Sequence, residues 1–207
     1  LTTILSTSML LQEETQPEDP MYPELETIAK ETLRCRKIVT SLLDFARQTK
    51  PDKKENDLNG IVKESLLLTK KQAAFKDVSV EHNLAPSLPR IFVDKGQIQQ
   101  ALINLVLNAI AATAAGGYVR VLTRYIPESR EVHVAVSDDG EGISEDDLVK
   151  IFDPFFTTKD DGSGLGLAIT HGIVEQHNGS IEAQSKLGCG TTFTIKLPLA
   201  RDKVYEN

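Results

Sequence analysis

Residues Lys95–Ala115, KGQIQQALINLVLNAIAATAA, predict a helix that is apolar over most of its surface and ends before Gly116 and Gly117. Its polar side chains follow steps of three, four and four residues, so that four amides share one face: Gln97, Gln100, Asn104 and Asn108. Buried amides need hydrogen-bond partners, and neighbouring backbone can supply them. Alternatively, an asparagine oxygen can complete a magnesium shell beside nucleotide phosphates and water.

Glycines gather after this helix, since nine of the 13 lie between Gly140 and Gly190. They form the clusters DDGEGI (138–143), GSGLGL (162–167) and GCGTTF (188–193). GSGLGL leads into an expected helix, and the unpaired amides at a helix N-terminus suit phosphate oxygens. GSGLGL lacks the Lys-Ser/Thr of a Walker A loop and the strand-turn-helix context of a dinucleotide fingerprint. Taken singly, each cluster is equally compatible with a plain turn.

Asp138 ends the apolar strand VHVAVSD (132–138), which predicts a buried carboxylate. Such a carboxylate needs a donor, and the exocyclic amine of adenine is one, whereas a guanine carbonyl in the same place would repel it. The alternative is that Asp138 caps a helix beginning near Ser144, a position that Ser144 itself serves better.

The order of expected elements divides the chain into two domains. Residues 1–56 hold two amphipathic helices, which form a hairpin, and most of the charged linker TKPDKKEND (49–57). A lone hairpin buries little of its apolar stripe, so we expect a four-helix bundle in a homodimer. Residues 57–207 mix helices with largely antiparallel strands, so the fold class is α+β, a helical hairpin followed by an α/β sandwich with a mixed sheet. The expected helices are 1–14, 23–48, 58–75, 95–115, 145–151 and 165–177, and the expected strands are 78–83, 90–93, 119–125, 131–137, 180–185 and 191–197.

Composition excludes several classes of function. Thirty acidic against 23 basic side chains give a net charge of -7, which disfavours a nucleic-acid partner. Cys35 and Cys189 are far apart and fit neither a disulfide framework nor a metal site, so a reducing, cytoplasmic setting is expected. The longest apolar stretch, residues 101–115, is too short to span a bilayer, so this part of the protein is expected to make no membrane contact.

Several motifs occur in one order: NLVLNA (104–109), DDGEGI, IFDPFFTTK (151–159), GSGLGL and GCGTTF, followed by IKLP (195–198). This order resembles the N box, first glycine box, F box and later glycine boxes of sensor histidine kinases, over residues 57–198. RCRKIVTSLLDFAR (34–47) is similar to the second helix of that family's dimerisation and phosphotransfer hairpin. The resemblance implies a kinase that takes ATP and Mg²⁺ as cofactors and transfers the γ-phosphoryl group to a histidine. The receiver domain of a response regulator would then accept it on an aspartate.

The resemblance also implies roles for single residues. Asn108 would coordinate magnesium, and Asp138 would accept the adenine amine, directly and through water. Thr157–Ser163 would form a short ATP lid, in which Lys159 could approach the γ-phosphate. The expected lid anchors are Phe152, Phe155 and Phe156. The expected nucleotide-binding residues are Asn104, Asn108, Asp138, Gly140, Gly142, Ile143, Phe156, Thr158, Lys159, Gly162, Ser163, Gly164, Leu165, Gly166, Leu167 and, on the adenine side, Thr192.

The acceptor histidine of that family has no counterpart here. In the family it precedes a segment like LTTIL (1–5), with which this chain begins. We therefore expect this chain to be a piece of a longer protein, and the piece itself to contain no catalytic acceptor. The longer protein can be membrane-anchored. The four histidines fall in expected strands or in the helix after GSGLGL, and are interpreted as structural or surface residues: His82, His133, His171 and His177.

Two other functions stay open. A non-kinase, ATP-gated module of the same superfamily would resemble chaperone, mismatch-repair or topoisomerase nucleotide domains. The segment RCRKIVTSLLDFAR argues against it, as does the lack of a catalytic acid in residues 101–113. The other is a purely structural dimerisation module whose pocket binds no nucleotide. A nucleotide titration would distinguish it from the kinase and from the ATP-gated module.

Overall fold

The computed structural model describes residues 1–46, 50–159 and 162–199, except the side chains of residues 37, 41 and 44–46. It contains two compact units. The first comprises Leu1–Thr49 and Phe155–Leu165, and the second comprises Lys50–Pro154 and Gly166–Asn207. Residues 47–48 of the expected second helix and residues 160–161 of the expected lid lie outside the described residues.

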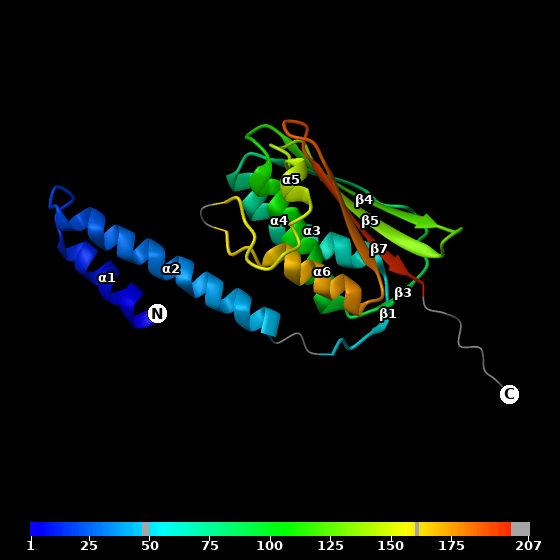
Figure 1. Ribbon diagram of the computed structural model, residues 1–207, viewed down its shortest axis with the longest axis horizontal. Helices are drawn as coiled ribbons and strands as arrows, with labels where there is room; N and C mark the ends of the chain where they lie inside the picture. The colour runs from blue at the N-terminus through cyan, green and yellow to red at the C-terminus, as the bar shows by residue number, and fades with distance from the viewer. Residues whose placement is uncertain (47–49, 160–161, 200–207) are drawn as a thin grey trace. The chain divides into compact units, whose positions relative to one another are not determined.

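The first unit contains the expected helical hairpin, formed by α1 (Thr2–Glu14) and α2 (Met21–Ala46), shown in blue in Figure 1. The Ser8 hydroxyl ties the helices together by donating to the Leu25 carbonyl at 2.7 Å, and both residues are buried. Many apolar side chains of the hairpin remain exposed: Leu1, Ile4, Met9, Leu10, Leu11, Met21, Ile28, Leu33, Val39, Leu42 and Leu43. A stripe of this kind favours association, and the homodimer stays a prediction.

The second unit is built on a five-stranded mixed sheet in the order β2-β4-β5-β7-β6. β2 runs parallel to β4, and the other pairs are antiparallel. α3, α4 and α6 lie together on one face of the sheet (Figure 1). The bounds are β2 Ser79–Asn83, β4 Tyr118–Ile126, β5 Glu131–Asp138, β6 Ser180–Ser185, β7 Thr191–Pro198, α3 Leu58–Phe75, α4 Lys95–Ala112, α5 Glu145–Leu148 and α6 Gly166–Gln176. This is the α+β class that the sequence predicted.

The core lies between this sheet and its helices. Alternate residues of β5 are buried, beginning at Val132 and ending at Asp138. The apolar face of α4 covers them with Ile98, Ala101, Leu102, Leu105, Val106, Ala109 and Ile110. The carboxylate of Asp138 therefore stands at the end of a row of buried valines. Among the helices that the structure describes, none is both long enough and apolar enough to cross a membrane.

One strand was not expected. β1 (Lys54–Asn56) pairs antiparallel with β3 (Ile91–Val93), so the interpretation of residues 54–56 as linker was wrong. The Asn56 amide donates to the Val93 carbonyl at 2.9 Å, and the Asp52 N–H donates to Asp94 Oδ2 at 2.9 Å. Backbone pairing holds this strand, and its sequence, Lys-Glu-Asn, has no apolar alternation that could indicate it. The domain boundary at 56/57 stays a prediction.

Candidate functional site

The centre of the candidate site is the Asp138 carboxylate, only 8% exposed at the end of β5. Its Oδ1 accepts hydrogen bonds from the Gly140 N–H (3.0 Å) and the Thr191 N–H (3.2 Å). These donors offset part of the cost of burying a charge. The capping alternative is wrong, because Ser144 Oγ caps α5 by accepting from the Asp147 N–H at 3.2 Å. A buried acceptor fixed at a strand end can read an amine such as that of adenine.

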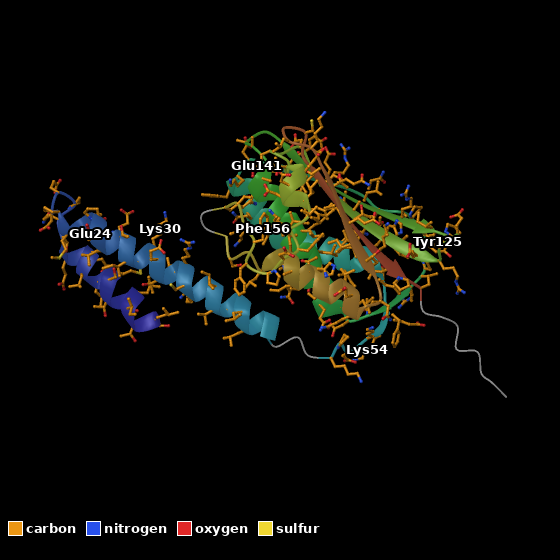
Figure 2. The ribbon with its side chains drawn as sticks, viewed as in Figure 1. Glu24, Lys30, Lys54, Tyr125, Glu141 and Phe156 are labelled. Atoms are coloured by element: carbon orange, nitrogen blue, oxygen red, sulfur yellow. The ribbon has the colours of Figure 1, made fainter. Side chains whose placement is uncertain are left out.

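Two glycines let three backbone segments meet around this carboxylate. Gly142 has φ 72°, and a Cβ there would lie 2.2 Å from the Lys186 carbonyl oxygen. Gly190 has φ 86°, and a Cβ there would lie 1.9 Å from the Asp138 carbonyl oxygen. Glycine alone tolerates both the conformation and the approach. The Gly188 N–H also donates to the carbonyl of Glu141 at 2.8 Å. Figure 2 shows Glu141 at the end of the sheet away from Tyr125.

The place of Thr192 in β7 separates its side chain from that of Asp138, and its expected role on the adenine side stays a prediction. Its hydroxyl donates to Ser137 Oγ at 2.9 Å, on the sheet face opposite Asp138. Thr191 is the residue that reaches Asp138, through its N–H, while its hydroxyl pairs with Ser185 Oγ at 2.8 Å. The period of two in a strand places the Thr191 side chain on the face of the buried Phe193 and the Thr192 side chain on the opposite face.

The amide face of α4 is half-buried at all four expected positions. The Asn104 Nδ2 donates, at a long 3.4 Å, to the carbonyl oxygen of Gly166, the first residue of α6. The Thr170 hydroxyl donates to the same oxygen at 2.9 Å. Neighbouring backbone thus satisfies part of the Asn104 side chain, as the simpler alternative held. The contact also places Asn104 beside the N-terminus of α6, where unpaired helix amides favour an anion.

Phe152 packs against both α6 and the sheet. Its ring centroid lies 5.3 Å from that of His171 on α6 and 6.4 Å from that of Phe193 on β7. Phe152 therefore fulfils the packing half of its expected anchoring role. Other side chains of α6 are buried: Ala168, Ile169, Thr170, Ile173 and Val174.

The expected lid has its own local structure within the first unit. The Phe155 N–H donates to the Gly164 carbonyl at 2.9 Å and closes the base of the segment. The Lys159 N–H donates to Thr157 Oγ1 at 3.1 Å. Phe155 is 60% exposed, with φ 70°, whereas Phe156, labelled in Figure 2, is half-buried. The expected role of both as lid anchors stays a prediction.

The structure brings together only part of the expected residue set. Asn104 meets the start of α6, which continues into the half-buried Leu167, and Asp138 meets the segment 140–143. In the first unit lie Phe156, Thr158, Lys159, Gly162, Ser163, Gly164 and the fully buried Leu165. Their position relative to Asp138, and the binding role of every residue in the set, stay predictions.

The four histidines have structural or surface positions. His82 is exposed on β2, His133 pairs with Glu131 at 3.0 Å and lowers the pKa of that carboxyl, and His171 faces Glu175 at 3.4 Å. His177 is 3% exposed; its Nε2 accepts from the Asp94 N–H at 2.9 Å, and its Nδ1 donates to the Ile173 carbonyl at 2.7 Å. Burial lowers the pKa of His177.

Comparison with known families agrees with this geometry. Residues 93–201, just over half of the chain, match the family described as histidine kinase-, DNA gyrase B- and HSP90-like ATPases. The chain belongs to this family. Among its members, the chain is similar to sensor histidine kinases. It is 36% identical to the sensor histidine kinase ZraS of Klebsiella oxytoca over 199 residues, which are 96% of this chain and 43% of ZraS.

Solved structures of histidine kinases share the fold. Full-length ShkA in complex with AMPPNP has a TM-score of 0.76 at 27% identity, covering 95% of this chain and 42% of ShkA. Histidine kinase ThkA in complex with the response regulator protein TrrA has a TM-score of 0.75 at 26% identity, covering 98% of this chain and 58% of ThkA. The chain thus spans less than two thirds of these relatives.

Proposed function

We propose that this chain is the ATP-binding kinase portion of a cytoplasmic two-component signalling core. It binds Mg-ATP, its γ-phosphoryl group passes to a histidine, and an aspartate of a response regulator then receives the group. The observation that carries the proposal is the Asp138 carboxylate, buried and fixed by two backbone donors. The match to an ATPase family, the AMPPNP bound to ShkA and the response regulator bound to ThkA support the proposal.

Nucleotide binding divides between two ends of this site. Asp138 accepts the adenine amine, and the glycine-lined backbone around it limits the space to a flat base. Asn104 and the first amides of α6 face the phosphates. The expected lid, Thr157–Ser163, closes over the nucleotide, with Lys159 toward the γ-phosphate.

Asn108 is the proposed protein ligand of magnesium. It lies one helical turn after Asn104 on the same half-buried face of α4, and an amide oxygen is a ligand that Mg²⁺ accepts beside phosphates and water. When bound, the ion neutralises phosphate charge. The residues of the chain orient the nucleotide, and positioning is most of what phosphoryl transfer asks of a protein.

The hairpin distinguishes a kinase from the non-kinase modules of the same family. The similarity to ZraS covers 96% of the chain and therefore includes part of α1 and α2 as well as the ATPase unit. The exposed apolar stripe of the hairpin suits a homodimer, in which two hairpins form one four-helix bundle.

Thermal unfolding with and without ligand tests the proposal. A ligand at about 100 times its Kd stabilises by about 2.7 kcal/mol, so Mg-ATP should raise the Tm by several degrees. In the Asn108→Ala variant, the Tm measured with Mg-ATP should differ little from the Tm measured with ATP and a chelator. Asn83→Ala, on an exposed edge of the sheet, should behave like the parent chain. No nucleotide-dependent shift in the parent chain would instead support a structural module with a dead pocket.

A further inference from the structure

α3 buries large apolar side chains in its first turns and exposes others farther along the helix. Leu58, Ile61 and Val62 are buried, whereas Leu67 is 71%, Leu68 64% and Phe75 86% exposed. Leu68 and Phe75 are seven residues apart and share one line along the helix, with Leu67 beside them. Single exposed leucines are ordinary, but three neighbouring large side chains form a patch that indicates binding.

The exposed part of α3 is also basic. Four exposed lysines lie close to the three apolar residues in the sequence: Lys63, Lys70 and Lys71 in the helix, and Lys76 directly after it. In the part of the chain that the structure describes, none of these four forms an ion pair with an acidic side chain, whereas Glu64 is paired with Lys95 at 2.8 Å. This local excess of positive charge stands out in a chain whose net charge is -7.

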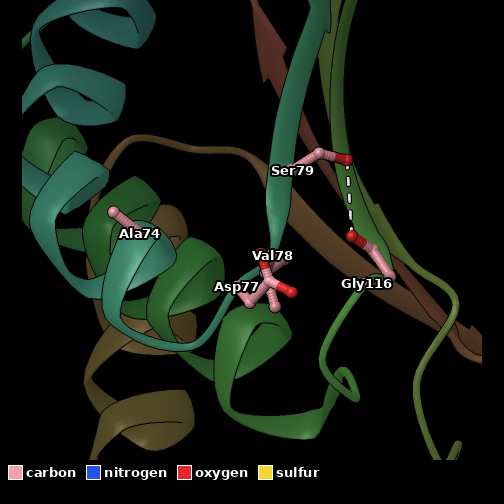
Figure 3. A pocket seen from close by; sticks show the side chains of 6 residues that line it. Ala74, Asp77, Val78, Ser79 and Gly116 are labelled. Atoms are coloured by element: carbon pink, nitrogen blue, oxygen red, sulfur yellow. Dashed lines mark hydrogen bonds between the residues drawn. The ribbon is translucent and has the colours of Figure 1, made fainter.

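A hollow of about 290 Å³ adjoins the C-terminal end of this face. Figure 3 shows Ala74 of α3, the segment from Asp77 to Ser79 and Gly116 around it. The hollow is held open by hydrogen bonds between its walls: the Gly116 N–H donates to the Asp77 carbonyl at 2.7 Å, and the Ser79 hydroxyl donates to the Gly117 carbonyl at 3.3 Å.

We propose that Leu67, Leu68 and Phe75, their four lysines and the adjoining hollow form a docking surface for a protein segment whose apolar side chains are flanked by carboxylates. Phe75 is the anchor of this α3 surface, because an exposed aromatic side chain gains most from burial in an interface. The lysines supply the charged rim, which guides association and selects an acidic partner.

The charges favour a protein over a phosphate-rich polyanion or membrane. The surface contains lysines and no arginine, the side chain best suited to bidentate phosphate binding. Separate carboxylates on a partner segment can each pair with one lysine.

Fluorescence anisotropy of a labelled synthetic peptide tests the α3 surface. The probe is an amphipathic 18-residue helix with a leucine stripe flanked by glutamates, and the comparison peptide carries lysines in place of those glutamates. The acidic peptide should bind the full 207-residue chain, more weakly at higher salt, and the basic one should not. In amide NMR spectra, the acidic peptide should shift residues 67–76 and Gly116–Gly117.

Variants decide whether binding occurs at this place. The double variant Leu68→Ser, Phe75→Ser should bind the acidic peptide at least about tenfold more weakly. The double variant Lys70→Glu, Lys71→Glu should weaken binding of the acidic peptide to a similar extent and allow the basic peptide to bind. Val149→Ser with Leu187→Ser, which removes exposed apolar side chains elsewhere, should change nothing. The proposal is overturned if the acidic peptide does not bind, if both α3 variants bind it normally, or if phosphatidylserine vesicles bind through these residues and the peptide does not.

Discussion

At the scale of single residues, His177 shows how burial and hydrogen bonding depend on one protonation state. Its Nε2 accepts the Asp94 N–H, so the proton of the neutral ring resides on Nδ1, which donates to Ile173. Protonating Nε2 would bring its N–H against the Asp94 N–H at the start of α4, so that two donors would face each other. Burial lowers the pKa of His177, opposed in part by the Ile173 carbonyl and by Asp94, while Lys53 adds to the lowering.

The stability of the protein should therefore fall on mild acidification. His177 has an ordinary pKa of 6.5 and a lower pKa in the folded protein, so between these two values the unfolded chain binds more protons than the folded one. The free energy of unfolding therefore falls as the pH drops below 6.5. Urea unfolding from pH 7.5 to 5.5 measures this loss. His177→Gln, whose amide oxygen can accept from Asp94, should flatten the dependence, and His82→Gln should not. Equal slopes for the parent chain and His177→Gln would remove His177 from the explanation.

Individual site residues were predictable where a side chain interrupts a regular pattern. Asp138 ends an apolar strand, and Asn104 and Asn108 interrupt an apolar helix, so the sequence pattern alone singles out each of them. Thr191 is not singled out in this way, because its contribution to Asp138 is a backbone N–H, which any residue except proline can provide. The exposure of Phe155 was equally hidden, since it depends on a backbone turn with φ 70°.

At the scale of elements, the long periodic segments were predictable, and the short or polar ones were not. α3 and α4 begin at the expected residues because Asp57 and Asp94 cap them. α4 ends three residues earlier than expected, where Thr113 turns to an extended conformation and the Ala112 carbonyl accepts the Glu141 N–H. That contact and the pairing of β1 are tertiary, so local sequence does not encode them.

The lid should exchange its amide protons quickly in the free protein. Thr157, Thr158 and Lys159 are exposed, and the Lys159 N–H donates to the neighbouring Thr157 hydroxyl. Adding Mg-ATP should slow exchange from Thr157 to Ser163. The Phe155 amide, held by the Gly164 carbonyl, should be protected in both states and so serves as an internal reference. Strong protection of the whole segment without nucleotide would contradict a gating role.

The hairpin should carry the homodimer. Leu42 is 44% exposed on α2, and in the proposed bundle it becomes buried. Leu42→Glu would then bury an unpaired carboxylate and should cost several kcal/mol of association, on the order of 3 to 5. Lys30→Glu, on the opposite side of α2 from Ile28, is the matched charge control. Light scattering that finds Leu42→Glu as dimeric as the parent chain would place the interface elsewhere.

At the scale of the whole molecule, an ATPase unit and a helical hairpin occur in one chain that spans 43% of ZraS. We interpret none of its four histidines as a phosphoryl acceptor, because they lie on strands of the ATPase unit or on and just after α6. In-line transfer requires the nucleophile within about 3 to 3.5 Å of phosphorus.

This chain should accordingly bind ATP without labelling itself. Incubation with γ-labelled ATP should leave all 207 residues unlabelled. A hairpin that carries an acceptor histidine ahead of the LTTIL segment should become labelled, with an acid-labile, base-stable product. Stoichiometric acid-labile labelling of the present chain would mean that one of its own histidines is an acceptor after all.

The most direct test of the central claim is a calorimetric titration with Mg-ATP and Mg-GTP. The account predicts that ATP binds and that GTP binds at least about tenfold more weakly, because a guanine carbonyl would face the Asp138 carboxylate. Asp138→Ala should weaken ATP binding by about tenfold to a hundredfold, as the loss of a hydrogen bond to a charged group does. Glu141→Ala, at an exposed neighbouring position, should leave it unchanged. Equal affinities for ATP and GTP, or undiminished ATP binding by Asp138→Ala, would contradict the account.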